Sequence, residues 1–243
     1  MLIRSIVFWT AWAVSGLAWA GVTLENTRVI YPGNARQVDL VASNPTSEAS
    51  LIQVWIDDGD ISLTPDNAQA PFTITPPLAR VMPGTSQTLR IIFTGADLPS
   101  DRESLFFLNM LDTPPKPKLG ADTNYIQFAM RSRIKLLFRP PNLPDTPFNV
   151  AGNVRWKLEP SEAGLQLVAS NASPYVFSLV NVRAMRGEQA LAELSPSHVP
   201  PFGSMAFSAY KSEGVLADCT SVKFQFVDDY GAYRDLEIPL TRP

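Results

Sequence analysis

Apolar and polar residues alternate through residues 124–140, NYIQFAMRSRIKLLFRP. Neighbouring side chains of a strand point to opposite faces, so this pattern predicts a long β-strand with two different faces. The apolar face is interrupted only by a serine and consists of Ile126, Phe128, Met130, Ser132, Ile134, Leu136 and Phe138. The opposite face is dominated by cations and consists of Tyr125, Gln127, Ala129, Arg131, Arg133, Lys135, Leu137 and Arg139.

The predicted strand is longer than a single sheet normally accommodates. Its 17 residues would span roughly 55 Å, whereas ordinary strands have about five or six residues. We therefore expect it to extend beyond its own sheet and to leave part of its apolar face without a partner inside the molecule. Because unpaired apolar strands promote aggregation, a protein that keeps one is expected to use it to bind another chain.

Shorter alternating stretches precede this strand and are separated by turn signals such as Pro32-Gly33-Asn34. About seven strands in roughly 120 residues is a spacing typical of an immunoglobulin-like sandwich. The prolines within residues 72–84 exclude that stretch from the centre of a sheet. The predicted strands of this half lie in residues 22–32, 37–44, 50–60, 72–84, 88–95, 98–112 and 124–140.

A proline-rich joint at residues 139–147, with four prolines in nine positions, separates this half from a second alternating region. The second region predicts strands in residues 154–160, 165–171, 175–184, 205–210, 221–229 and 235–240. Since no segment has sustained helical periodicity, the predicted fold class is all-β, with two immunoglobulin-like β-sandwich domains in tandem. The predicted boundaries are 1–20 for a signal peptide, 21–141 for the first domain, 142–147 for the linker and 148–243 for the second domain.

The first 20 residues have the features of a secretory signal peptide. Arg4 provides the positive start, an apolar run follows, and Ala18-Trp19-Ala20 forms a small-residue cleavage site. We expect cleavage after Ala20 and a mature chain that begins at Gly21. The apolar run is shorter than the ~20 residues of a membrane span, which favours cleavage over an uncleaved anchor and predicts no stable membrane insertion.

Composition narrows the class of partner. Proline accounts for 22 of 243 residues, which favours short strands joined by turns over helices. Removing Arg4 with the signal peptide leaves 19 basic and 23 acidic residues, a net charge near −4. Because nucleic-acid-binding domains carry basic patches on a basic chain, we expect no nucleic-acid partner.

Candidate chemistry is sparse, since Cys219 and His198 are the only residues of their kinds. An unpaired cysteine in a secreted chain is either a free thiol or bonded to another molecule, so the fold cannot depend on internal disulfides. His198 lies in the proline-bounded segment 195–201, where we expect a solvated loop. A Cys/His zinc site lacks ligands and no glycine-rich phosphate motif occurs, so we predict no enzyme activity and no cofactor.

Three aspartates, Asp57, Asp58 and Asp60, have side chains of the type that binds calcium. Aspartates beside a glycine, here Gly59, are more typical of a hairpin turn. We therefore predict no metal site.

Residues 98–114 read LPSDRESLFFLNMLDTP, with charged turn residues 101–104, then Phe107, Asn109 and a closing Pro114. This segment resembles the signature of the periplasmic pilus chaperones of the chaperone–usher pathway, the PapD-like family, although Thr113 replaces an aliphatic residue. Three more segments resemble that family in the same order: VTLENTRVIYPG, ITPPLARVMPG and IKLLFRPP. The resemblance covers essentially residues 21–243.

The resemblance implies two immunoglobulin-like domains in an L or boomerang arrangement. It also implies a periplasmic chaperone that binds, folds and caps pilus subunits, which lack their final strand, and delivers them to an outer-membrane usher. The chaperone lends the missing strand, and chaperone–pilin pairs are a known instance of strand addition.

The same resemblance implies roles for individual residues. Ile126, Phe128 and Met130, called the donor residues below, would enter the subunit; the alternative is that they face the protein's own core. Arg28 and Lys135 would grip the subunit's C-terminal carboxylate.

The resemblance further implies that Glu103, Arg139 and Asp229 form an ionic group that fixes the inter-domain angle. The short connection at residues 113–123 indicates the short-loop subclass of the family. The family's second domain often has a disulfide between its final strands, whereas Cys219 has no partner, which leaves a thiol that could be reactive.

One other interpretation stays open at this point. A secreted carbohydrate-binding or adhesive sandwich pair would need exposed aromatic platforms, and Trp55 and Trp156 form no obvious cluster. The donor edge could also support self-association of the free protein.

Overall fold

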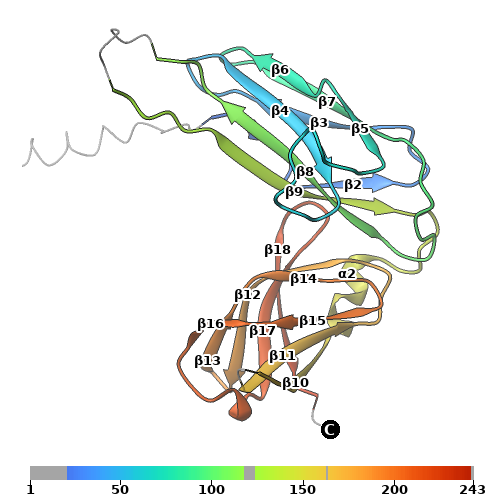
Figure 1. Ribbon diagram of the computed structural model, residues 1–243. Coiled ribbons are helices and arrows are strands. Elements are labelled where there is room, and N and C mark those ends of the chain that lie inside the picture. Colours follow the sequence, from blue (N-terminus) through green and yellow to red (C-terminus); the bar gives the residue numbers. More distant parts are fainter. Residues whose placement is uncertain (1–20, 118–123, 163, 242–243) are drawn as a thin grey trace, which may run out of the picture.

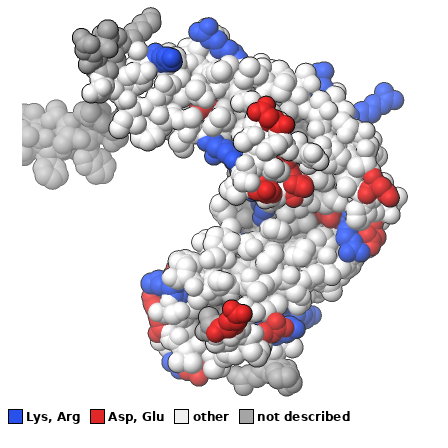
Figure 2. Space-filling model, viewed as in Figure 1, with Lys and Arg blue, Asp and Glu red and all other residues white. Residues whose placement is uncertain are grey.

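The computed structural model describes residues 21–117, 124–162 and 164–241. Two β-sandwiches lie at an angle to each other and form a bent molecule with a hollow between them (Figures 1 and 2). The all-β, two-domain prediction and the bent arrangement are therefore confirmed. The predicted signal peptide and part of the 113–123 connection lie outside the described residues.

The N-terminal domain contains a four-stranded and a five-stranded sheet. In sheet order, the first comprises β1 (Thr23–Leu24), β3 (Val38–Ser43), β7 (Ser86–Phe93) and β5 (Phe72–Thr75). The second comprises β2 (Arg28–Pro32), β9 (Met130–Arg139), β8 (Ser104–Thr113), β4 (Ser50–Asp57) and β6 (Leu78–Val81). The prolines between β5 and β6 mark the point where the chain changes sheets, and both strands are sheet edges, as the proline pattern predicts.

Tyr31 joins the two sheets of this domain. Its ring is buried and stacks on Phe138, with 5.9 Å between the ring centroids, and it also contacts Phe72 and Phe93. Its hydroxyl donates to the Ala35 carbonyl and accepts from the Phe93 amide, so the polar end is satisfied inside the core.

The long strand is shorter in the structure than the alternation predicts. Only Met130–Arg139 form β9, and residues 124–129 belong to no strand. The prediction of a single 17-residue strand is wrong in its bounds, because alternation reports which face a side chain takes but not whether a neighbouring strand is present.

The C-terminal domain pairs a three-stranded sheet with a six-stranded one. The smaller sheet comprises β10 (Arg155–Ser161), β11 (Gly164–Asn171) and β15 (Gly203–Phe207). The larger comprises β16 (Ala209–Ser212), β13 (Gln189–Leu194), β12 (Phe177–Arg186), β17 (Ser221–Val227) and β18 (Tyr233–Pro239), with β14 (Ser197–Val199) paired to β12. The sequence pattern missed β13 and β14, and it merged β15 with β16.

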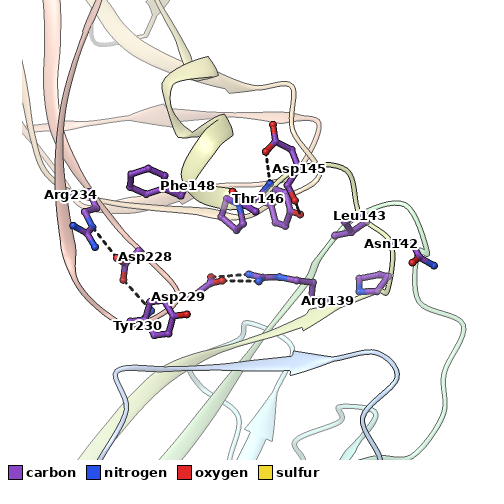
Figure 3. Close-up of a pocket in the computed structure, with 13 residues that line it drawn as sticks. Arg139, Asn142, Leu143, Asp145, Thr146, Phe148, Asp228, Asp229, Tyr230 and Arg234 are labelled. Atoms are coloured by element: carbon purple, nitrogen blue, oxygen red, sulfur yellow. Dashed lines mark hydrogen bonds and ion pairs between the residues drawn. The ribbon is translucent and has the colours of Figure 1, made fainter.

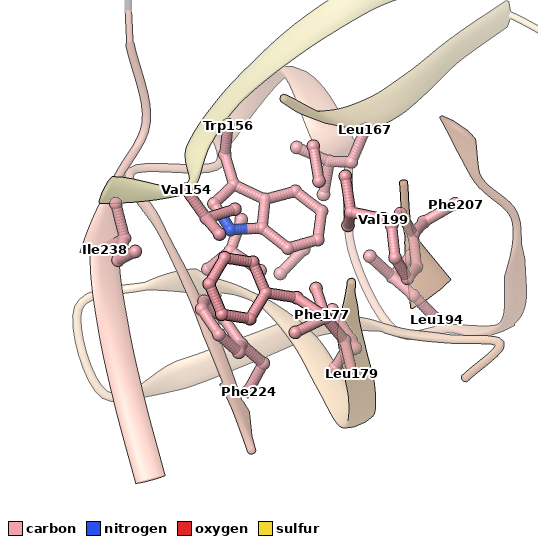
Figure 4. Close-up of a cluster of buried hydrophobic side chains, with 14 of the residues drawn as sticks. Val154, Trp156, Leu167, Phe177, Leu179, Leu194, Val199, Phe207, Phe224 and Ile238 are labelled. Carbon is pink, nitrogen blue, oxygen red and sulfur yellow. The ribbon is translucent and has the colours of Figure 1, made fainter. Parts of the chain in front are cut away.

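The core of the C-terminal domain surrounds Trp156 (Figure 4). This side chain is fully buried and packs against Phe207 and Phe224, with ring centroids 5.0 and 5.7 Å away. Cys219 is buried at the same core and its thiol contacts the Ser221 carbonyl. Burial raises the pKa of Cys219, and both the raised pKa and the lack of exposure disfavour a reactive thiolate.

Helical structure within the described residues is limited to short turns. These are α2 (Pro147–Val150), capped by Thr146, and the 3-10 turns η1 (Ala151–Asn153) and η2 (Leu216–Asp218). The first two follow the proline-rich joint and lead the chain into the second domain.

Arg139 connects the domains at the end of β9. Its guanidinium donates to Glu103 Oε1 at 2.7 Å. It also donates to both carboxylate oxygens of Asp229, at 2.7 and 2.8 Å (Figure 3). Glu103 is 3 % exposed and its second oxygen accepts from the Val176 amide of the C-terminal domain. A cavity of about 530 Å³ adjoins this ionic group and is lined by Phe148 among others.

The charges of this group are balanced against burial. Burial raises the pKa of Glu103, and the attraction of Arg139 only partly opposes that rise. Burial also lowers the pKa of Arg139, but hydrogen bonds and attraction from Asp229 and Glu103 outweigh it, so the net pKa of Arg139 is raised. Arg139 therefore stays charged and is the cation on which the buried Glu103 depends.

Replacing this cation should destabilise the protein in a pH-dependent way. Arg139→Met is expected to lower the free energy of unfolding by about 3–5 kcal/mol at neutral pH, because it leaves a buried carboxylate unpaired. A carboxyl group whose pKa is higher in the folded than in the unfolded protein stabilises the fold while it is protonated, at low pH. That stabilisation is lost as the pH rises through the folded-state pKa. The loss in Arg139→Met should therefore be smaller near pH 5 than near pH 8 by urea denaturation.

Arg155→Met is a matched control, since within the described residues the side-chain hydrogen bonds of this exposed arginine go only to the backbone carbonyls of Gly152 and Val154. It should change stability by no more than about 0.5 kcal/mol. An equal loss for Arg139→Met at both pH values would contradict the role given to Glu103.

Candidate functional site

The donor residues are exposed. Ile126, Phe128 and Met130 are 82 %, 73 % and 58 % exposed, so they are not part of the domain's own core. Farther along the same face, Leu136 and Phe138 are buried. The alternating segment thus has an exposed apolar part at residues 126–130 and a buried apolar part within β9, joined through Ser132 and Ile134.

The exposed part of β9 also has a free backbone edge. β8 pairs with β9 from Met130 to Phe138, whereas β2 covers the other edge only from Lys135 to Arg139. Among the residues that the structure describes, no strand pairs with that second edge between Met130 and Ile134. The N–H and C=O groups of this stretch that point away from β8 can therefore accept another strand.

A concave region lies beside the donor residues. It has a volume of about 430 Å³ and is lined by Phe128 and Met130 together with Pro114, Pro115 and residues 46–50 among others. The Gln127 side chain donates to the Pro114 carbonyl, which ties the segment before β9 to the end of β8.

Arg28 and Lys135 meet at the point where the free edge ends. They are cross-strand partners in the parallel ladder of β2 and β9, and Arg28 is the first residue of β2. Paired residues on adjacent strands place their side chains on the same face of a sheet. A strand added along the free edge would therefore end against both cations.

Arg28 is almost fully buried, with 8 % of its surface exposed. Its Nη1 donates to the Val227 carbonyl of the C-terminal domain at 2.8 Å, while its buried Nε has no hydrogen-bond partner within the described residues. Burial lowers the pKa of Arg28, although Asp229, Asp228 and Glu103 attract it from a distance. A buried guanidinium with an unused N–H favours an anion at this position.

Lys135 also reaches across to the C-terminal domain. Its Nζ donates to the Ser178 hydroxyl at 2.7 Å. Burial, followed by repulsion from Arg28, lowers the pKa of Lys135 to about 8. Neither Arg28 nor Lys135 forms an ion pair with any described carboxylate, so the pair is a positive site without a directly bound anion at the junction of the two domains.

Sequence reasoning missed two residues of this site, Ser178 and His198. They lie opposite each other on β12 and β14. His198 is half-buried, so its assignment to a solvated loop is wrong: the proline-bounded segment forms a short strand against β12. The presence of the only histidine was a signal, whereas nothing in the sequence distinguishes Ser178 from other strand serines.

Arg131 and Arg133, which have no predicted role, are occupied within the N-terminal domain. Arg133 donates to buried Asp57 at 2.6 Å and lies over the Phe107 ring. Arg131 binds Asn109 and the carbonyls of the loop after β4, and it lies over Trp55. These contacts hold that loop on the sheet and leave the two arginines unavailable for an anion.

Asp57 thus has a structural role. Burial raises its pKa, but hydrogen bonds from Arg133, Asn109 and the Gly59 amide outweigh it, so the net pKa is lowered. No cluster of three or more metal-ligating side chains occurs among the described residues. The helices in this part of the chain are all too short to span a membrane.

The chain is similar to known proteins along most of its length. A family model described as "Pili and flagellar-assembly chaperone, PapD N-terminal domain" matches residues 21–144. A second model, "Pili assembly chaperone PapD, C-terminal domain", matches residues 149–238.

Individual relatives agree with these matches. The chaperone protein HifB of Haemophilus influenzae is 36 % identical, over 98 % of this chain and 97 % of the relative. The chaperone protein FimB/FhaD of Bordetella pertussis is 37 % identical, over 88 % of this chain and 86 % of the relative.

Solved structures with the same fold include the Pseudomonas aeruginosa CupB2 chaperone, with a TM-score of 0.73, 32 % identity, and coverage of 90 % of this chain and 100 % of that one. A chain from the complex of Salmonella enterica SafA pilin with the SafB chaperone gives a TM-score of 0.75 and 30 % identity, covering 93 % and 99 %. With a sandwich matching each family model and relatives over almost the entire length, this chain belongs to the PapD family of pili assembly chaperones.

Proposed function

We propose that this chain binds pilus subunits by strand addition, with Ile126, Phe128 and Met130 as the side chains that enter the subunit. The observation that carries this proposal is the free edge of β9, which is apolar and exposed at one end and closed at the other by buried Arg28 and half-buried Lys135. The complex of SafA pilin with the SafB chaperone, whose fold this chain shares, supports a pilin as the partner.

A pilus subunit that lacks its final strand is an incomplete β-sandwich. An incomplete sheet exposes core side chains and an unpaired edge, both of which promote aggregation. Burying the three donor side chains would contribute roughly 1.5–3 kcal/mol each, or about 5–9 kcal/mol together before the costs of association. The backbone of the donor segment supplies the missing ladder.

The position of the cations sets the direction of the guest strand. β2 lies parallel to β9 and begins at Arg28, directly beside Lys135. A guest whose C-terminal carboxylate meets this pair must approach along the free edge from Met130 toward Lys135, and therefore runs parallel to β9. Each charge-assisted hydrogen bond to the carboxylate is worth about 1.5–3 kcal/mol, which fixes the register against slips of two residues.

The proposed activity takes place in the periplasm. Residues 1–20 direct the chain to the periplasm and are cleaved after Ala20, and the loaded chaperone passes its subunit to an outer-membrane usher. Self-association of the free protein through the same edge would compete with subunits.

Both tryptophans in the described residues, Trp55 and Trp156, are buried, which gives no support to a carbohydrate-binding platform.

Removing the lysine charge should abolish capture without unfolding the chaperone. Lys135→Met retains the aliphatic stem, and recovery of subunit co-purified from the periplasm should fall at least about tenfold, in line with the loss of a charge-assisted bond. Arg28→Ala should have the same effect, although it also removes the bond to Val227. Lys157→Met, at an exposed lysine of the C-terminal domain, is the control; wild-type recovery with Lys135→Met would refute the anchor.

The titration of Lys135 should make subunit affinity fall above about pH 8. The free protein has a lowered lysine pKa of about 8, and a bound carboxylate raises it, so the complex binds more protons than the free chaperone. Affinity should therefore decrease by up to about tenfold per pH unit until the bound-state pKa is reached. Calorimetry from about pH 7 to about pH 10 measures this, and Lys135→Arg, whose charge persists, should remove the slope.

Phe128→Glu should separate binding from stability. Because this side chain is 73 % exposed, the change should leave the melting temperature of the free protein within about 2 °C while abolishing subunit capture. Val215→Glu, at another exposed apolar residue on the far domain, should preserve both properties. A large fall in melting temperature with normal capture would reverse the assignment.

A further inference from the structure

The imidazole of His198 stands beside the cation pair, on the opposite domain. His198 is directly across from Ser178 in the antiparallel pair of β14 and β12, and such neighbours have Cβ atoms about 4.5–5.5 Å apart on one face. Ser178 is the residue whose hydroxyl accepts the Lys135 hydrogen bond. Lys135, Ser178 and His198 therefore form a continuous group that spans the two domains.

The imidazole is available for a ligand. His198 is half-buried, and neither ring nitrogen has a hydrogen-bond partner among the described residues. Burial, followed by repulsion from Lys135, lowers the pKa of His198, so the ring is neutral at neutral pH and offers one N–H donor. A half-buried donor without a partner among these residues, close to Lys135, matches the needs of an anion.

The charged groups around His198 come from few elements. β11 and β15, which pack against β14, carry no titratable residue. The charged residues of β12 are Arg183 and Arg186, beyond the stretch that pairs with β14. Across the hollow, β9 presents Lys135, with Arg28 of β2 beside it. Lys135 is thus the cation that a bound carboxylate would shield from the imidazole.

We propose that His198 is a third binding residue for the carboxylate held by Arg28 and Lys135. This inference rests on the proposed function and deepens it, because the subunit's C-terminus is then gripped by both domains rather than by the N-terminal domain alone. The neutral ring donates one hydrogen bond to a carboxylate oxygen. Protonation of the ring adds a third positive charge to the site.

The consequence is a dependence of binding on pH in the acidic range. A carboxylate favours the protonated ring, so the bound state has a higher His198 pKa than the free state and takes up a proton on binding. Affinity should therefore rise as pH falls through this interval. Since an opposite charge within ~4–6 Å shifts a pKa by about 1–3 pH units, the gain should reach about tenfold or more.

Because the chain has one histidine, NMR can follow His198 without ambiguity in protein that carries no histidine tag. N-acetyl-alanine is the carboxylate probe, and N-acetyl-alaninamide is the matched control without a charge. With the acid, we expect the His198 pKa to rise by about one pH unit or more and the Lys135 Cε–H resonance to shift. The amide should change neither, and Lys135→Met should abolish the response to the acid.

The outcomes separate the two proposals. If the acid shifts Lys135 but leaves the His198 pKa unchanged, the third contact is refuted and the two-cation anchor stands. If neither residue responds to the acid, the anchor itself is refuted, and the role of His198 with it. As a second readout, His198→Phe should lower affinity for a co-purifying subunit more at about pH 6 than at about pH 8; an equal loss would indicate a purely structural role.

Discussion

The site depends on where β2 begins. β2 covers one edge of β9 only from Lys135 onward, and this single limit determines three properties. It leaves the edge between Met130 and Ile134 open, places Arg28 at the end of that edge and, under the proposed function, sets the direction of a guest strand parallel to β9. The covered half of β9, with Leu136 and Phe138 in the core, holds the open half in place.

The cost of this arrangement is electrostatic. Two cations without a carboxylate partner, one almost fully buried, repel each other and lose hydration. The sheet register forces Arg28 and Lys135 together, and neutral acceptors on the other domain, the Val227 carbonyl and the Ser178 hydroxyl, offset part of the penalty. A bound carboxylate would remove more of this electrostatic penalty, which would favour the bound protein over the free one.

Alternation and turn signals predict the all-β class, both sandwiches and most strands, because the face of each side chain follows from period two. They fail where a neighbour decides the outcome: residues 124–129 alternate but are unpaired, and β14 is too short to show a period. For the site, family resemblance supplied Arg28 and Lys135, whereas Ser178 and His198 required the structure, since contacts between domains leave no periodic trace in either segment.

The inter-domain angle and the anchor are one geometric unit because the turn from β17 to β18 touches the N-terminal domain at three points. Val227 accepts from Arg28, Asp229 accepts from Arg139, and Gly231, at φ +82°, approaches Thr27 so closely that a side chain would clash. Any change in the angle would therefore disturb the two bonds that orient the cations, from Arg28 to the Val227 carbonyl and from Lys135 to the Ser178 hydroxyl. The ionic group around Arg139 would then serve the proposed binding as well as stability, since a carboxylate site built from two domains keeps its dimensions only while their angle is fixed.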